Sequence, residues 1–311
     1  MSPDGRVLND NWSDLSGLAP EIDGDRLKSY RLSRIRAAMR EADIDLCIAI
    51  SPISLRYAID YRNYALFQSH IPTTYLFVPL DGPLVLHGAY DPKPGAYELR
   101  TGRPLSFFDG GHELDDAARE FARDVERFLH EIGSTGRRVA IEYVNPGVTR
   151  ALADRDIEVL DGVVPLEEAR VVKSDVEIEC MRWAVRVAEY AIGRVQESIR
   201  PGVSELQLWA LLNYTNLANN GDWHDGRVLV SGPRINPWCQ EASPRRVESG
   251  DLVGMDTDMI GPFGYFADIS RTFHCGPAKP TRRQRELYRL ALAEIEHNLQ
   301  LVRPGISLDE F

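Results

Sequence analysis

Hydrophobic and polar positions alternate between helical and strand-like spacing over roughly the first half of the chain. Residues 26–43 carry apolar side chains at helical spacing and lead into the apolar run at 45–50, which is typical of a buried strand. The alternation then continues through further strand-like runs and one long charged helix, at residues 74–79, 83–87, 115–132 and 137–143. These interleaved patterns predict an α/β domain over residues 1–162.

The pattern changes after residue 162, where long helical stretches begin. Ser174 and Glu177 have the spacing of a capping box, in which each side chain bonds the other residue's backbone N–H at a helix start. We therefore expect a second domain over residues 163–311, opening on long helices.

The second region contains two similar short segments, which we call the RPG segments. A predicted helix ending at 199 is followed by the sequence RPGVS at 200–204, and a predicted helix ending near 302 is followed by RPGIS at 303–307. Each unit reads as a helix, a Pro-Gly stop and a Ser that can cap the next helix. A match this short can arise by chance. If it is a true repeat, the second domain is the first half of a duplicated fold, and the sequence is truncated relative to that fold.

The net negative charge of the chain limits which kinds of molecule it can bind. The 311-residue chain has a formal charge of −11, which argues against nucleic acid or an anionic membrane as its main partner, because phosphate binding needs excess Lys and Arg. Small-molecule and peptide substrates stay open. No apolar run approaches the roughly 20 residues of a spanning helix, so we predict a cytoplasmic protein. The four cysteines are scattered, and we expect them to be reduced.

The strongest chemical signal is a carboxylate hairpin at residues 251–274. Asp256 and Asp258 lie two apart on one predicted strand, so their side chains share a face. Asp268 has the same parity beyond a turn centred near Pro262, which brings it to that face opposite one of the pair. Three carboxylates are therefore expected on one patch.

A patch of three like charges needs a compensating positive charge. A divalent cation supplies one, and oxygen ligands suit manganese, iron, magnesium or calcium. The alternative is a solvated acidic hairpin that Arg271 partly neutralises. Alternating apolar residues around the carboxylates indicate a largely buried ribbon, which favours metal binding at Asp256, Asp258 and Asp268.

These motifs resemble the creatinase, prolidase and methionine aminopeptidase family, known for its pita-bread fold. The resemblance rests on the segments GDLV at 250–253 and DISRTF at 268–273, the helical opening at 169–184 and the Ser-Gly-Pro at 231–233. It implies an α/β creatinase-like N-terminal domain, followed by the first half of an α+β pita-bread catalytic domain.

The resemblance also implies a pair of divalent metals, with iron, manganese, zinc or cobalt as candidates. In that family two hairpin Asp hold the metals together with a His and two Glu from the second half of the domain. Those positions, and the catalytic residues, would lie beyond Phe311. The fragment alone is then expected to bind metal weakly and to turn over little. A homodimer is a further implication of the resemblance.

Two departures from the peptidases bear on the reaction. Their hairpin Asp are one residue closer together than Asp256 and Asp268, and their active-site His falls where this chain has Cys239. A thiol cannot replace an imidazole that shuttles protons near neutral pH. Both departures, with the segments 231–241, 255–261 and 267–272, are similar to the dimethylsulfoniopropionate lyases built on this fold.

The resulting hypotheses belong to different classes. The leading one is a metal-dependent β-elimination at a carbon–sulfur bond of a small carboxylate substrate, in which all three Asp are metal ligands. The alternative is an Xaa-Pro dipeptidase or aminopeptidase P-like hydrolase acting on short peptides. A non-catalytic pita-bread module that binds peptides ranks third, because loss of the hairpin Asp would be expected there.

Candidate substrate residues are Trp238, His70 and Phe67. Trp238 follows an Asn-Pro and could wall a pocket for a cationic sulfonium group, or simply pack under its loop. His70 could reach a neighbouring subunit's active site, or be a hydrogen-bonded structural His. Phe67 stands where the lyase branch has Trp. Two further histidines, His224 and His274, are expected in a solvated turn and at a cap or surface position.

Overall fold

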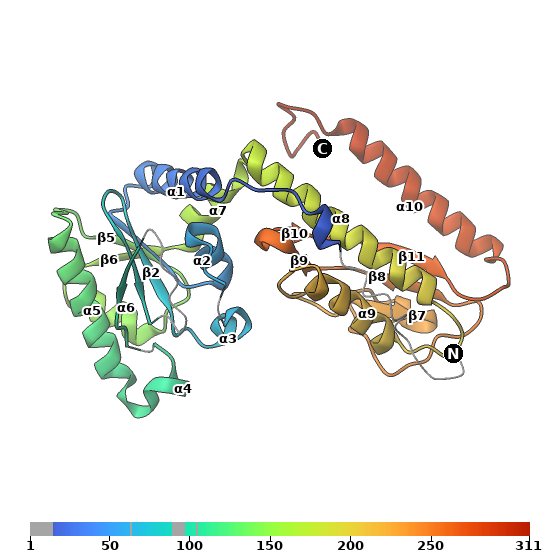
Figure 1. Cartoon of the computed structure of the whole chain (residues 1–311), viewed down its shortest axis with the longest axis horizontal. Helices are drawn as coiled ribbons and strands as arrows, with labels where there is room; N and C mark the ends of the chain where they lie inside the picture. Colours follow the sequence, from blue (N-terminus) through green and yellow to red (C-terminus); the bar gives the residue numbers. More distant parts are fainter. Residues whose placement is uncertain (1–14, 63, 89–96, 104) are drawn as a thin grey trace. The chain divides into compact units, whose positions relative to one another are not determined.

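The computed structural model describes residues 15–62, 64–88, 97–103 and 105–311 (Figure 1). They form two compact units. The N-terminal unit comprises residues 18–183 and the short insert 263–265. The C-terminal unit comprises residues 184–262 and 266–311, together with the described residues before 18.

The N-terminal unit is built on a six-stranded mixed sheet in the order β4-β3-β2-β1-β5-β6. Strand β1 pairs antiparallel with β2 and parallel with β5. Strands β2 and β3 pair antiparallel, whereas β3 pairs parallel with β4 and β5 pairs parallel with β6. The strands are β1 (Leu46–Ala49), β2 (Tyr75–Pro79), β3 (Leu84–His87), β4 (Tyr97–Arg100), β5 (Arg138–Ile141) and β6 (Glu158–Asp161).

Helices cover both faces of this sheet, because the central strands are apolar on both sides. On β1, Leu46 and Ile48 belong to the core beneath α5 and α6, whereas Cys47 and Ala49 belong to the core with α1, α2 and α7. The helices are α1 (Gly24–Glu41), α2 (Pro52–Ile59), α3 (Ala65–His70), α4 (Phe107–Gly110), α5 (Leu114–Glu131), α6 (Pro146–Ala153) and α7 (Val163–Val171).

The C-terminal unit combines long helices with a small sheet and a ribbon. Strands β11-β8-β7 form an antiparallel three-stranded sheet, and β9 pairs antiparallel with β10. The elements are α8 (Asp175–Ser198), α9 (Glu205–Ala218), β7 (Leu229–Ser231), β8 (Leu252–Met255), β9 (Met259–Ile260), β10 (Phe266–Ala267), β11 (Arg271–His274) and α10 (Arg282–Leu301). Short 3-10 turns lie at Ser16–Leu18, Gly111–Glu113, Gly232–Ile235 and Pro262–Gly264.

The start of α8 has the predicted capping box. The Glu177 carboxylate accepts a hydrogen bond from the Ser174 backbone N–H at 2.7 Å, and the Ser174 hydroxyl accepts one from the Glu177 N–H at 3.2 Å. Helix α9 begins with a second such box, formed by Ser204 and Gln207. The sequence therefore located both helix starts through the same short-range chemistry.

The two RPG segments adopt the same turn. Gly202 has φ of 89° and Gly305 has φ of 87°, both in the region that favours glycine. In each turn the residue after the glycine donates its N–H to the arginine carbonyl at 3.3 Å, Val203 to Arg200 and Ile306 to Arg303. This shared geometry supports the similarity of the two segments. That they mark a duplicated domain, of which the sequence holds the first half, stays a prediction.

The division into units does not coincide with the change in sequence pattern. The compact N-terminal unit extends to Trp183, inside α8, rather than ending at residue 162. It also includes the turn residues 263–265 of the carboxylate hairpin. Independent domains at 1–162 and 163–311 therefore stay a prediction. No helix in the described ranges is long and apolar enough to cross a membrane.

A buried polar network joins the inserted turn to the rest of the N-terminal unit. The Tyr265 hydroxyl donates to Glu177 at 2.9 Å, and the Arg31 Nε donates to the Tyr265 hydroxyl at 3.3 Å. Arg31 and Glu177 form an ion pair at 3.8 Å, and both side chains are only 2% exposed. The Arg31 guanidinium also lies over the rings of Tyr57 and Tyr265, at 5.2 and 5.0 Å from their centroids. Removal of one partner would leave a buried charge uncompensated.

We predict that Glu177→Ala destabilises the protein by about 3–5 kcal/mol, because it leaves the buried Arg31 charge without its ion-pair partner. Chemical denaturation measures the loss. Glu179→Ala is the matched control on an exposed position of the same helix, and it should change the unfolding free energy by less than about 0.5 kcal/mol. Equal effects of the two substitutions would contradict a structural role for the network.

Candidate metal centre

The carboxylate hairpin is interrupted where its acidic residues lie. Met255 of β8 pairs with Arg271 of β11, and Met259 of β9 pairs with Ala267 of β10. Both pairs have the same register. Between them lies a break without backbone pairing, in which residues 256–258 face residues 268–270. Continuing this register sets Asp258 opposite Asp268, in agreement with the parity argument.

The structure brings the three predicted carboxylates together. One carboxylate oxygen from each of Asp256, Asp258 and Asp268 lies within 4.8 Å of the others. Asp256 and Asp258 are half-buried, whereas Asp268 is exposed. Three acceptors at this separation can surround a single cation.

Thr257 holds the two sides of the break together. Its side chain is fully buried, and its hydroxyl donates to the Ala267 carbonyl at 2.6 Å while accepting from the Ile269 N–H at 2.8 Å. One hydroxyl therefore takes the place of the missing backbone pairing, on both sides of Asp268. Because side chains alternate along a strand, Thr257 points away from the face that Asp256 and Asp258 share.

A neighbouring loop supports the same segment. The Asp225 N–H donates to the Asp258 carbonyl at 3.0 Å, and the His224 Nδ1–H donates to the Thr257 carbonyl at 2.6 Å. Asp258 has φ of 38°, an uncommon conformation for a residue other than glycine. These bonds keep its backbone in place.

The expectation of a solvated His224 is wrong. Its ring is half-buried, lies edge-on to Trp209 at 5.2 Å, and has its Nε2 buried without a hydrogen-bond partner in the described ranges. Burial lowers the pKa of His224. The Gly and Asp residues around it indicated a surface turn, but that turn folds back on the hairpin.

Loss of hydration and mutual repulsion raise the proton affinity of the cluster. Although Asp268 is exposed, partial loss of hydration of its carboxylate, together with the neighbouring Asp256 and Asp258, raises its pKa to about 6. Burial, with the charges of Asp256 and Asp225 nearby, raises the pKa of Asp258. Two charges about 4 Å apart repel by about 1 kcal/mol in water and about 4 kcal/mol near a protein surface. A single hydrogen bond contributes only about 0.5–1.5 kcal/mol, so a proton or a cation must offset part of the repulsion.

No cationic side chain in the described ranges pairs with these carboxylates. Within the part of the chain that the structure describes, none of the ion pairs involves the three carboxylates. Arg271, the expected neutralising residue, donates instead to the Ser270 carbonyl at 2.8 Å. An all-oxygen donor set without a protein counter-charge fits a hard divalent cation.

Trp238 packs against Gly254 of β8. A Cβ added to Gly254 would lie 2.9 Å from a ring carbon of Trp238, so the indole occupies the space that a side chain would fill. Gly254 has the same parity as Asp256 and therefore shares its face of the strand. Trp238 is 42% exposed, which leaves part of the residue free to contact a ligand.

A buried carboxylate anchors the loop that carries Trp238. Glu205 is fully buried and accepts hydrogen bonds from the backbone N–H groups of Ser231 and Ser243, at 2.7 and 3.0 Å. It also pairs with Arg234. Both ends of the loop are thus tied to the first turn of α9.

The other two substrate candidates lie on α3 of the N-terminal unit. His70 is exposed, and its Nδ1 lies 2.8 Å from the Leu66 carbonyl oxygen. Phe67 stacks edge-on with Tyr64 and Phe108, at 5.5 and 5.4 Å between ring centroids. Their contribution to a substrate pocket stays a prediction. His274 is half-buried within β11, and Cys239 is exposed with φ of 65°.

Comparison with known proteins places this geometry in a family. Residues 179–311 match metallopeptidase family M24. The chain is 31% identical over 313 residues to the dimethylsulfoniopropionate lyase DddP of Roseovarius nubinhibens, covering 96% of this chain and 69% of the lyase. It is 27% identical over 230 residues to the Xaa-Pro dipeptidase of Pyrococcus horikoshii, covering 70% of this chain and 64% of the dipeptidase. The solved structure of X-Pro aminopeptidase from Thermotoga maritima matches with a TM-score of 0.69 at 19% identity. The match covers 88% of this chain and 73% of the aminopeptidase.

The fold and its relatives define a metal-dependent enzyme with a prolidase-like, mixed α/β architecture. The chain belongs to metallopeptidase family M24. The expected pita-bread family is therefore confirmed, as is a metal-dependent enzyme of the lyase or hydrolase kind. The chain spans 69% and 61% of the lengths of the DddP lyases from Roseovarius nubinhibens and Roseobacter denitrificans.

We predict that Thr257→Val lowers the affinity of the cluster for Mn²⁺ about 10–100-fold, because loss of a group that orients metal ligands typically has that effect. Thr257→Ser keeps the hydroxyl and should restore most of the affinity. Isothermal titration measures binding, and thermal unfolding checks that each variant folds. Equal affinities in the Val variant and the original protein would contradict the role given to the hydroxyl.

Binding of Mn²⁺ should weaken at low pH. Because the folded-state pKa of Asp268 is raised to about 6, the metal-free cluster holds an extra proton below that pH, which a bound cation must displace. We expect affinity to fall by about tenfold per pH unit below pH 6 and to level off above pH 7, as measured by titration calorimetry. Unchanged affinity between pH 5 and 7 would show that Asp268 takes no part.

Proposed function

We propose that this chain belongs to a metal-dependent lyase that performs β-elimination at a carbon–sulfur bond of a small carboxylate, with dimethylsulfoniopropionate as the leading substrate. The observation that carries the proposal is the Asp-Thr-Asp segment, which adds Asp258 to the carboxylates of Asp256 and Asp268. The 31% identity to a lyase over nearly the whole chain supports the same reaction.

Asp256, Asp258 and Asp268 would hold a divalent cation, with iron, manganese, zinc and cobalt as candidates. Such a cation, when bound, supplies Lewis acidity toward the substrate carboxylate and makes the adjacent α-proton easier to remove. In the elimination a base takes that proton, its electron pair forms the carbon–carbon double bond, and the carbon–sulfur electrons leave with sulfur. No base is assigned within the described ranges.

Trp238 would hold the cationic end of this substrate. Its partly exposed indole lies on the same face of β8 as Asp256, and an aromatic face attracts a sulfonium by a cation–π interaction. His70 and Phe67 are proposed to contribute to the pocket from a second subunit of a homodimer. A cytoplasmic location and the dimer stay predictions.

The second candidate is hydrolysis of Xaa-Pro peptides. It is favoured by the fold, since prolidases and an X-Pro aminopeptidase are among the solved structures that match. Cys239 opposes it, because it stands where the resemblance to the peptidases expects an active-site His. A non-catalytic peptide-binding module ranks last, because all three hairpin carboxylates are present and converge.

The decisive assay compares dimethylsulfoniopropionate with Xaa-Pro dipeptides, using the product of the intact gene with added Fe²⁺ or Mn²⁺. We expect one acrylate and one dimethyl sulfide per substrate consumed, and a loss of activity to background in Asp258→Asn and Asp268→Ala. Asp309→Asn, at an exposed position, is the matched control and should retain full activity. Proline release without dimethyl sulfide would establish the hydrolase instead.

A further inference from the structure

A second pocket lies in the N-terminal unit, between the ends of β3 and β4 and one face of α5. It has a volume of about 420 Å³, enough for a small organic molecule. Its lining is charged or polar almost throughout, and consists of His87, Arg100, Thr101, Gly102, Arg103, Glu120, Asp124 and Arg127. The carboxylate hairpin contributes none of these residues.

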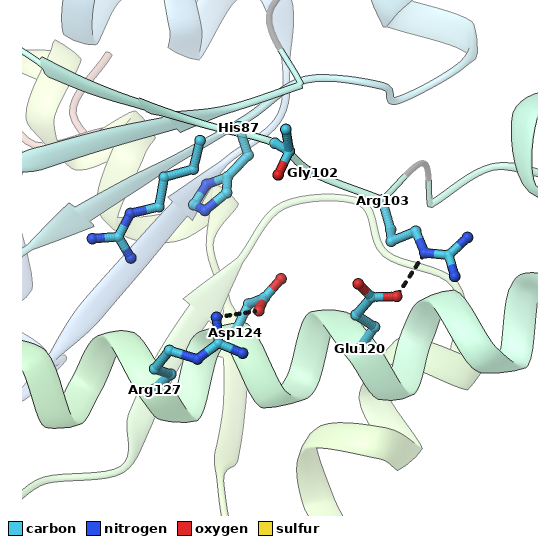
Figure 2. A pocket seen from close by; sticks show the side chains of 8 residues that line it. His87, Gly102, Arg103, Glu120, Asp124 and Arg127 are labelled. Atoms are coloured by element: carbon cyan, nitrogen blue, oxygen red, sulfur yellow. Dashed lines mark hydrogen bonds and ion pairs between the residues drawn. The ribbon is translucent and has the colours of Figure 1, made fainter.

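The inner wall of this pocket carries a buried imidazole. His87 is only 2% exposed, and its ring stacks on Tyr75 with 4.8 Å between centroids. Figure 2 shows the ring pointing from its strand toward α5, where Asp124 and Arg127 lie across the gap. Its Nδ1 is buried and has no hydrogen-bond partner in the described ranges, which is unfavourable unless a group in the pocket satisfies it.

His87 is best suited to accept a hydrogen bond. Burial, reinforced by the nearby Arg100, lowers the pKa of His87 to about 4, so the ring is neutral at pH 7. A neutral imidazole has one nitrogen that accepts. Across the gap Asp124 offers carboxylate acceptors, and a ligand cation with N–H groups could donate to both residues.

Gly102 keeps this inner wall open. A Cβ at residue 102 would lie 2.9 Å from the His87 Cβ and 2.8 Å from the Tyr75 hydroxyl oxygen, so any larger residue would collide with the wall. The chain after β4 therefore passes close to the imidazole without covering it.

Charges of both signs surround the rest of the pocket. Arg103 pairs with Glu120 at 2.6 Å, and Arg127 pairs with Asp124 at 3.2 Å. Arg100 pairs with carboxylates outside the lining. Glu120 and Asp124 would repel a simple anion, and the arginines would repel a simple cation. A ligand with only one kind of charge is therefore not attracted by all of the lining residues. Ion pairs near the surface contribute little to stability, so a ligand with both charges can exchange them at small cost.

We propose that this pocket binds a small amino acid, with the ligand ammonium between His87 and Asp124 and the ligand carboxylate on the guanidinium groups of Arg103 and Arg127. The site is separate from the carboxylate hairpin and would serve as a recognition or regulatory site. It does not depend on the lyase reaction, so the two proposals can fail independently.

Titration of the protein with glycine, β-alanine and 4-aminobutyrate tests this site, with the ring signals of His87 followed by NMR and assigned through His87→Phe. We expect saturable binding of at least one of them, and about tenfold weaker binding of propionate and of propylammonium, each of which carries only one of the two charges. The proposal is overturned if none of the three amino acids binds at up to ~50 mM, a concentration that would detect even a dissociation constant weaker than about 1 mM.

Variants separate this pocket from the rest of the surface. Asp124→Asn and His87→Phe should each weaken amino-acid binding at least tenfold, whereas Asp116→Asn, at an exposed position on the same helix, should leave it unchanged. His87→Phe should also keep or raise the melting temperature, because it removes an unpartnered buried nitrogen. Binding that survives both pocket variants would place the amino acid elsewhere and contradict the assignment.

Discussion

The site depends on keeping three carboxylates together against their own repulsion. Asp256, Asp258 and Asp268 meet at a break in the hairpin, where backbone pairing cannot hold the two strands. The Thr257 hydroxyl bridges that break from the opposite face, and the loop at 224–225 fixes the backbone beside it. Loss of hydration and the repulsion that remains give the cluster its raised proton affinity, and the excess of negative charge makes it a place for a cation.

Two features of the chain connect this cluster to a reaction. The Asp-Thr-Asp segment provides a third carboxylate, and Gly254 leaves room for the Trp238 ring on the same face of the strand. The hairpin turn itself is held by the buried Arg31, Glu177 and Tyr265 network of the N-terminal unit.

Much of this was predictable because it depends on short-range rules. Strand parity and an odd-length turn were enough to bring Asp268 to the face of Asp256 and Asp258, opposite one of the pair, and capping chemistry located the start of α8. The roles of Thr257 and His224 were not predicted, because they depend on contacts across the break and with a distant loop. Parity alone could have shown Thr257 facing away from the carboxylates, but its acceptor and donor lie on the other strand. His87 was hidden in the same way, since nothing in its strand indicates a pocket beside α5.

The most direct measurement of the central claim is a crystal structure of Mn²⁺-soaked protein, with the metal located by anomalous scattering. The account predicts a peak whose nearest neighbours include oxygens of Asp256, Asp258 and Asp268, at the roughly 2.0–2.2 Å typical of carboxylate ligands to metals of this size. A peak held by Asp256 and Asp268 with Asp258 turned away, or no peak at the hairpin, would contradict it.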